Sequence, residues 1–241
     1  MAVNQVHDPR AATRRFFAVV AIAFPLIILA GFARTYYLKP IFDAPPVSSL
    51  LVHLHGFLMT LWIALFATQV FLISSRRVKV HQKLGIAGVA LGVLIIPVGL
   101  FTAVAAAKYG SPSTPPGFPP LAFMAVPFFD IVVFAMLLAG VVYYRKQPAN
   151  HKRLVLLTVL NFLPPALGRI PLAPVQTLGP LFFFGLPDLI AIIFLVVDTW
   201  KSGKLNKVYL AGTLLLIVSH PLRIIISGTD AWMGFAAWIT G

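Results

Sequence analysis

Residues 53–85 read HLHGFLMTLWIALFATQVFLISSRRVKVHQKLG, and this stretch decides the fold class. It begins with two histidines, continues as an apolar run of helix length, and ends in a basic turn that carries His81. An α-helix rises about 1.5 Å per residue, so the run is long enough to cross a bilayer. The stretch therefore predicts a membrane-spanning helix whose two sets of histidines lie about 30 Å apart and belong to different sites.

The composition extends this interpretation to the whole chain. Of the 241 residues, 59% are hydrophobic and only 10% are charged, which is typical of a polytopic membrane protein. The chain has no cysteine, and this excludes disulfides and thiolate metal sites. The net charge of +13 comes from basic residues in short turns between apolar runs, so it indicates orientation in the bilayer rather than nucleic-acid binding.

Apolar runs of about 20 residues recur along the chain, and each is long enough to span a membrane. We expect one all-α transmembrane domain over residues 1–241, with seven helices. These are expected near 16–33, 49–74, 84–107, 119–144, 154–172, 180–199 and 208–227. In the remaining segment, 228–241, three aromatic residues recur at every third position and favour a short helix in the outer interface. They are Trp232, Phe235 and Trp238.

The basic residues divide unevenly between the two sides of this bundle. Clusters at 10–15, 76–83, 145–153 and 201–207 fall on one side. The other side holds only Arg34, Lys39 and Lys108, beside the proline-rich segment 111–120. The positive-inside rule therefore predicts a cytoplasmic N-terminus and a C-terminus outside.

The second predicted helix carries one polar and aromatic stripe. Residues spaced four, three, four and three apart lie on one face of an α-helix. They are His55, Met59, Trp62, Phe66 and Gln69. His53 lies roughly 200° around the helix from His55, so the two do not chelate one ion unless the helix entry is unwound.

Charged residues within the apolar runs predict a polar cavity. Each costs about 2.5–3.5 kcal/mol at the bilayer centre, so it should face the bundle and find a partner. Counting along the helices places the ionisable groups in the outer half: His55, Asp130, Arg169, Asp188, His220 and Arg223. Asn161, followed by Pro164 and Pro165, predicts a kink at the same depth.

Two interpretations of this outer cluster stay open. In the first, His55, His220, Asp130 and Asp188 hold a metal ion in an outward-facing cavity. In the second, Asp188 forms a buried ion pair with Arg169 or Arg223, and the histidines bond to carbonyl groups.

The cytoplasmic side offers a different candidate site. His81 and His151 stand at the starts of two predicted helices, beside basic residues. Two imidazoles from facing helices can hold a haem iron, so the pair is a candidate axial ligand set for haem b. The alternative is that both are interfacial histidines near lipid headgroups.

Several of these motifs resemble known families. His55-Gly56, Leu58-Met59, Trp62, Arg76-Arg77 and His81-Gln82 resemble the first half of the core of transmembrane cytochromes b of the ascorbate-linked diheme and ferric-reductase type. That resemblance implies one haem between His81 and His151, while no histidine opens the helix near 119–126 to pair with His55. Over most of its length, the chain more closely resembles a large group of uncharacterised bacterial seven-helix inner-membrane proteins. The shared elements are His55, HQKLG at 81–85, the stretch 151–172 and HPLR at 220–223, and they imply the seven-helix fold and the topology of that inner-membrane group.

Three functions follow from these features. The first is a redox protein that uses haem b or an Fe, Cu or Zn ion and exchanges electrons with a quinone or another membrane donor. The second is a membrane-embedded metal-dependent enzyme acting on a lipid-like substrate. The third is a transporter, receptor or assembly subunit that binds a small ligand. The charged residues within the apolar runs all lie toward the outer end, so we expect that end to carry the function.

Overall fold

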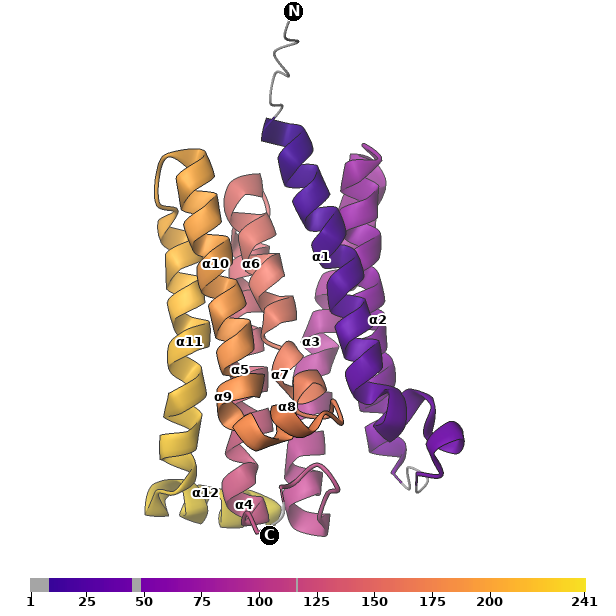
Figure 1. Cartoon of the computed structure of the whole chain (residues 1–241), viewed down its shortest axis with the longest axis vertical. Coiled ribbons are helices and arrows are strands. Elements are labelled where there is room, and N and C mark those ends of the chain that lie inside the picture. The colour runs from indigo at the N-terminus through magenta and orange to yellow at the C-terminus, as the bar shows by residue number, and fades with distance from the viewer. Residues whose placement is uncertain (1–8, 45–48, 116) are drawn as a thin grey trace, which may run out of the picture.

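The computed structural model describes residues 9–44, 49–115 and 117–241, with the side chains of 9–14 and 174–176 left out. The predicted basic side chains Arg10 and Arg14 lie outside this description. Every regular element in the described ranges is a helix (Figure 1).

The first half of the chain forms long helices joined by short turns. They are α1 (Pro9–Phe32), the π-helical turn η1 (Ala33–Tyr37), the 3₁₀ turn η2 (Lys39–Phe42), α2 (Leu50–Ser74), α3 (Val78–Tyr109), α4 (Pro120–Phe123) and α5 (Ala125–Tyr143). The second half is more broken. It consists of α6 (Pro148–Leu160), α7 (Leu163–Leu167), α8 (Ala173–Leu178), α9 (Pro180–Phe183), α10 (Gly185–Ser202), α11 (Lys207–Ser227) and α12 (Asp230–Thr240).

Within the described residues, six helical stretches are long and apolar enough to cross a membrane. They are Arg15–Tyr37, Leu50–Ser74, Val78–Tyr109, Pro120–Tyr143, Pro180–Ser202 and Lys207–Ser227. Large apolar side chains such as Val19, Phe101 and Ile225 are exposed along these helices, which suits contact with lipid. The described part of the chain is thus all-helical, and its apolar helices indicate a multi-pass membrane protein.

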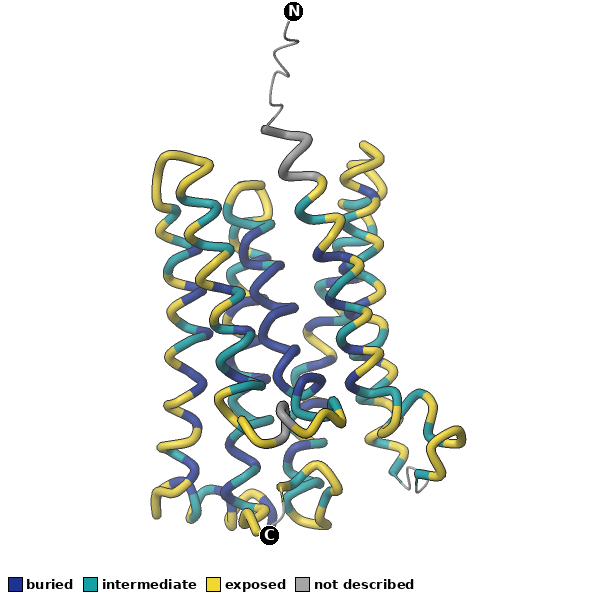
Figure 2. Tube along the Cα trace, in the orientation of Figure 1, coloured by how far each residue is buried: buried dark blue, intermediate teal, exposed yellow. Residues whose placement is uncertain are grey.

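The helix expected over 154–172 differs from the prediction. It begins earlier, at Pro148, and it is interrupted at Asn161 and Phe162 to give α6 and α7. Proline has no backbone N–H to donate, so Pro164 and Pro165 cannot continue the hydrogen-bond ladder of α6. This broken helix is the most deeply buried part of the bundle (Figure 2).

The helices run along the long axis of the molecule, which gives it two distinct ends (Figure 1). We call the end where α1 begins the basic end, because it holds the turns at 75–77, 144–147 and 203–206 with their arginines and lysines. At the opposite end, α12 lies across the bundle beside α4. The side chain of Trp232 donates from Nε1 to the carbonyl oxygen of Leu121 at 2.9 Å, whereas Trp238 is exposed. The expected helix in the C-terminal segment is therefore present.

Candidate functional site

The interior of the bundle holds a buried ion pair between Asp130 of α5 and Arg223 of α11. Both side chains are almost fully buried, and Arg223 donates from Nη1 to Oδ1 of Asp130. Arg223 also donates to the carbonyl and the hydroxyl oxygens of Ser219, at 3.1 and 2.9 Å. The side-chain amide of Asn161 donates from Nδ2 to the backbone oxygen of Asp130 at 2.9 Å. The helix break at Asn161 is thus tied to the same pair.

A second pair lies beside the first. Nδ1 of His220 is 2.8 Å from Oδ1 of Asp188, and the His220 ring stacks on Phe184 with centroids 4.6 Å apart. The Arg223 guanidinium lies 5.5 Å from the centre of the same phenyl ring. Asp188 therefore pairs with His220, and not with Arg169 or Arg223 as the ion-pair interpretation supposed.

These pairs bear on the predicted metal ligands. Asp130 is paired with Arg223 and Asp188 with His220, and His55 lies on α2, far across the bundle from α11 (Figure 1). Among the described residues there is no group of three or more His, Asp or Glu side chains able to hold a metal ion. The structure thus brings His220 and Asp188 together and keeps His55 apart from them.

The two histidines at the start of α2 point in different directions. Residues 53–55 lie within regular helix, so the unwound entry that a chelating pair would need is absent there. His53 is exposed, with its ring 6.0 Å from that of Tyr36. His55 is half-buried and within electrostatic range of Arg169.

The remaining stripe of α2 spans the length of the helix instead of lining one cavity. Trp62 and Phe66 are buried, and Trp62 packs against Phe134 with ring centroids 5.1 Å apart. Gln69 donates from Nε2 to the carbonyl oxygen of His81 at 3.2 Å, so it lies at the basic end. Fourteen residues of helix separate Gln69 from His55 by about 21 Å, which is why one stripe reaches both ends.

His81 of α3 and His151 of α6 meet at the basic end. Their ring centroids are 6.4 Å apart, and the ring planes are nearly perpendicular at 86°. His151 Nδ1 lies 3.0 Å from the carbonyl oxygen of Val141, and His81 Nδ1 is buried without a hydrogen-bond partner in the described residues. Because metal–imidazole bonds are about 2 Å long, two rings on opposite sides of one ion have centroids about 6 Å apart. The observed 6.4 Å is close to that value, and it also lies within the range of ordinary edge-to-face ring contacts.

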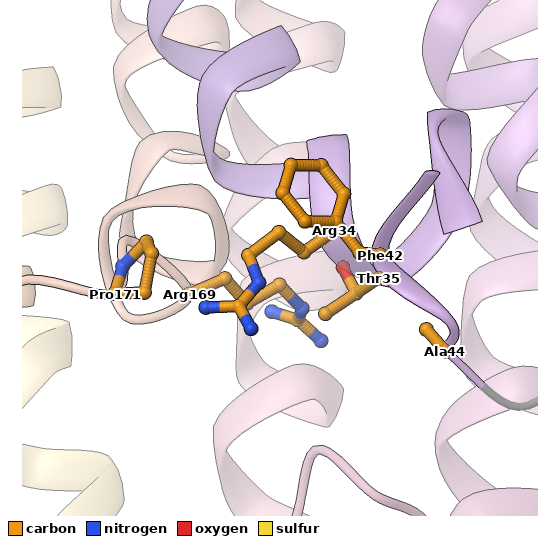
Figure 3. A pocket seen from close by; sticks show the side chains of 6 residues that line it. All are labelled: Arg34, Thr35, Phe42, Ala44, Arg169 and Pro171. Carbon is orange, nitrogen blue, oxygen red and sulfur yellow. The ribbon is translucent and has the colours of Figure 1, made fainter. Parts of the chain in front are cut away.

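A pocket of about 270 Å³ is lined by six residues from two separate parts of the chain (Figure 3). It lies between the turns η1 and η2 and the segment that follows α7. Its lining residues are Arg34, Thr35, Phe42, Ala44, Arg169 and Pro171. The predicted cavity residue Arg169 is therefore part of a real pocket, but its neighbour there is Arg34.

Arg34 was missed as a site residue because its charge served only to assign the sides of the membrane. A signal was available in the sequence. The side of the bundle opposite the basic clusters carries few cations, so each arginine on it needs a reason beyond orientation.

Comparison with known proteins does not assign these sites to a family. No known protein family, curated relative or solved structure matches the chain. The function must therefore be argued from the two end sites and the paired charges between them.

Proposed function

We propose that this protein is a redox protein of the bacterial inner membrane that binds haem b between His81 and His151. In this role it exchanges electrons with a quinone or another membrane donor and passes them toward an acceptor on the outer side. The observation that carries the proposal is the 6.4 Å separation of the two imidazole centroids, contributed by different helices.

The number of ligands favours haem over a bare metal ion. A protein site for a bare transition metal commonly supplies three or four side chains. Here the described part of the chain offers no third His, Asp or Glu beside the pair. A porphyrin supplies four nitrogens itself, so two imidazoles complete the coordination of its iron. When bound, the haem would supply one-electron chemistry.

The surrounding residues would orient the imidazoles. With the proton on Nδ1, His151 donates to the Val141 carbonyl, which leaves Nε2 as a lone-pair donor for iron. Gln69 holds the backbone of His81 from α2. The competing metal-dependent enzyme is less well supported, because Asp130 and Asp188 are already paired with Arg223 and His220.

The absorption spectrum of the purified protein tests this proposal. We expect a Soret band, a sharp α-band after dithionite, and about one haem per chain by pyridine haemochrome. His81→Ala and His151→Ala should each reduce the haem content at least tenfold. His53→Ala is the matched control, because that histidine is exposed and distant from the pair, and it should keep the full haem content. A protein that stays colourless after haem supplementation contradicts the proposal.

The orientation belongs to the same proposal. The basic end would face the cytoplasm, and the broken helix formed by α6 and α7 would serve as a seventh crossing. Because the chain lacks cysteine, single exposed cysteines can report on this. A membrane-impermeant maleimide should label Leu178→Cys in spheroplasts but not Ser75→Cys, unless the membrane is first permeabilised. If only Ser75→Cys is labelled in intact spheroplasts, the protein has the opposite orientation.

A further inference from the structure

The pocket at the opposite end contains two arginines that converge. Figure 3 shows the guanidinium groups of Arg34 and Arg169 side by side, reached from η1 and from the segment after α7. Neither forms an ion pair with a carboxylate in the described part of the chain. Two positive charges therefore share one small pocket without a counter-charge from these residues.

The two arginines that are buried in the bundle behave differently. Arg153 makes two hydrogen bonds of 2.9 Å to the carboxylate of Asp198, and Arg223 pairs with Asp130. Carboxylates thus compensate both of the buried arginines, as burial of charge requires. The uncompensated pair points to an anion that is not part of the chain.

Close helix packing brings the two arginines together. Gly31 of α1 contacts α7 so closely that a β-carbon there would overlap the carbonyl group of Ala166. Arg34 follows Gly31 by three residues, and Arg169 follows Ala166 by three residues. The contact between α1 and α7 therefore positions both guanidinium groups at the pocket.

Arg169 is held in place and still has donors to spare. It donates to the carbonyl oxygen of Pro165 and to the hydroxyl of Ser113, both at 2.6 Å, and its guanidinium lies 4.6 Å from the ring centre of Phe32. Two of its five N–H groups are thus used by the chain. A guanidinium group stays protonated at neutral pH, so Arg169 keeps its positive charge. Arg34 lies over the ring of Phe42 at 5.3 Å.

We infer that the Arg34–Arg169 pocket binds a phosphate group. Two planar guanidinium forks match the several oxygens and the double negative charge of a phosphomonoester. The volume of about 270 Å³ lies just below the usual range for drug-sized ligands, so it suits a small group such as a headgroup. The exposed apolar side chains of Leu38 and Ile41 beside it suit a lipid as the source, and a soluble phosphate is the other source.

Two binding measurements on the full-length protein test this inference and separate the sources. In the first, native mass spectrometry counts retained lipid after reconstitution in nanodiscs of phosphatidylcholine with phosphatidic acid. In the second, inorganic phosphate is titrated against the protein in nanodiscs of phosphatidylcholine alone, with the melting temperature as the readout.

We expect Arg34→Gln to abolish whichever response wild type shows, the retention of phosphatidic acid or the phosphate-dependent rise in melting temperature. Arg34 is exposed, so this variant should fold, and Arg169→Gln serves as a second variant. Lys108→Gln removes a cation in the last turn of α3, outside the pocket lining, and should behave as wild type. At least tenfold preference for phosphatidic acid, lost in Arg34→Gln, supports a lipid phosphate. A phosphate-dependent rise in melting temperature, lost in the same variant, supports a soluble one.

The inference is overturned if wild type shows neither response, or if Arg34→Gln retains both. Haem content is read separately from the absorption spectrum, so failure of the haem proposal leaves this result intact.

Discussion

Polar side chains meet different kinds of partner in the interior of this bundle and at its two ends. In the interior, unlike groups meet: Asp130 with Arg223, and Asp188 with His220. At the ends, like groups meet: His81 with His151, and Arg34 with Arg169. Unlike partners satisfy each other, so they stabilise the fold without any ligand. Like partners leave lone pairs or positive charges unmatched, so they indicate where a ligand belongs.

The largest expected effect comes from breaking an interior pair. Asp130→Asn leaves the buried Arg223 without a counter-charge, and we expect a loss of about 3 kcal/mol in the free energy of unfolding. Thermal or denaturant unfolding in detergent micelles measures it. Asp43→Asn is the matched control, because Asp43 is exposed and asparagine also tolerates its left-handed backbone with φ of 48°. Equal stability of the two variants would show that the interior pair does not hold the fold.

A smaller effect should follow at the contact that assembles the phosphate pocket. Gly31→Ala places a methyl group against the backbone of Ala166, so we expect a loss of about 1–3 kcal/mol and weaker phosphate binding. Gly234→Ala in α12 is the control, since an added β-carbon there meets nothing within 4 Å. If Gly31→Ala has the same melting temperature and the same phosphate affinity as wild type, the close approach of α1 to α7 does not determine the geometry of the pocket.

Much of the helix pattern could be predicted, because runs of apolar residues mark the hydrocarbon span directly. The ends were harder. Helix α3 begins at Val78, six residues before the expected start, because Lys79 and Lys83 lie on its polar first turns. Apolar content marks the buried span of a helix, while hydrogen bonding continues into the polar interface. Asn161 and the two prolines predicted a kink, whereas the structure has a full interruption that divides this helix into α6 and α7.

The candidate sites were predicted only in part. Counting residues along a helix gives the depth of a side chain but not its position around the bundle. Depth therefore grouped His55 with His220, although their helices stand far apart. The pairing of His81 with His151 was predicted because two helices beginning at one end must bring their first turns to the same depth. The convergence of Arg34 on Arg169 depends on the packing of α1 against α7, which no local pattern records.

The smallest effect should come from the pair at the edge of the interior. Arg153 and Asp198 have exposed side-chain fractions of 11% and 24%, so water screens their interaction more than it does that of Asp130 and Arg223. Asp198→Asn should cost about 1 kcal/mol in unfolding free energy, and part of that loss should disappear in high salt. The same unfolding series, run at low and high ionic strength, compares it with Asp130→Asn. If Asp198→Asn lowered the unfolding free energy as much as Asp130→Asn does, and if salt did not change this loss, solvent exposure would not determine how strongly each pair stabilises the fold.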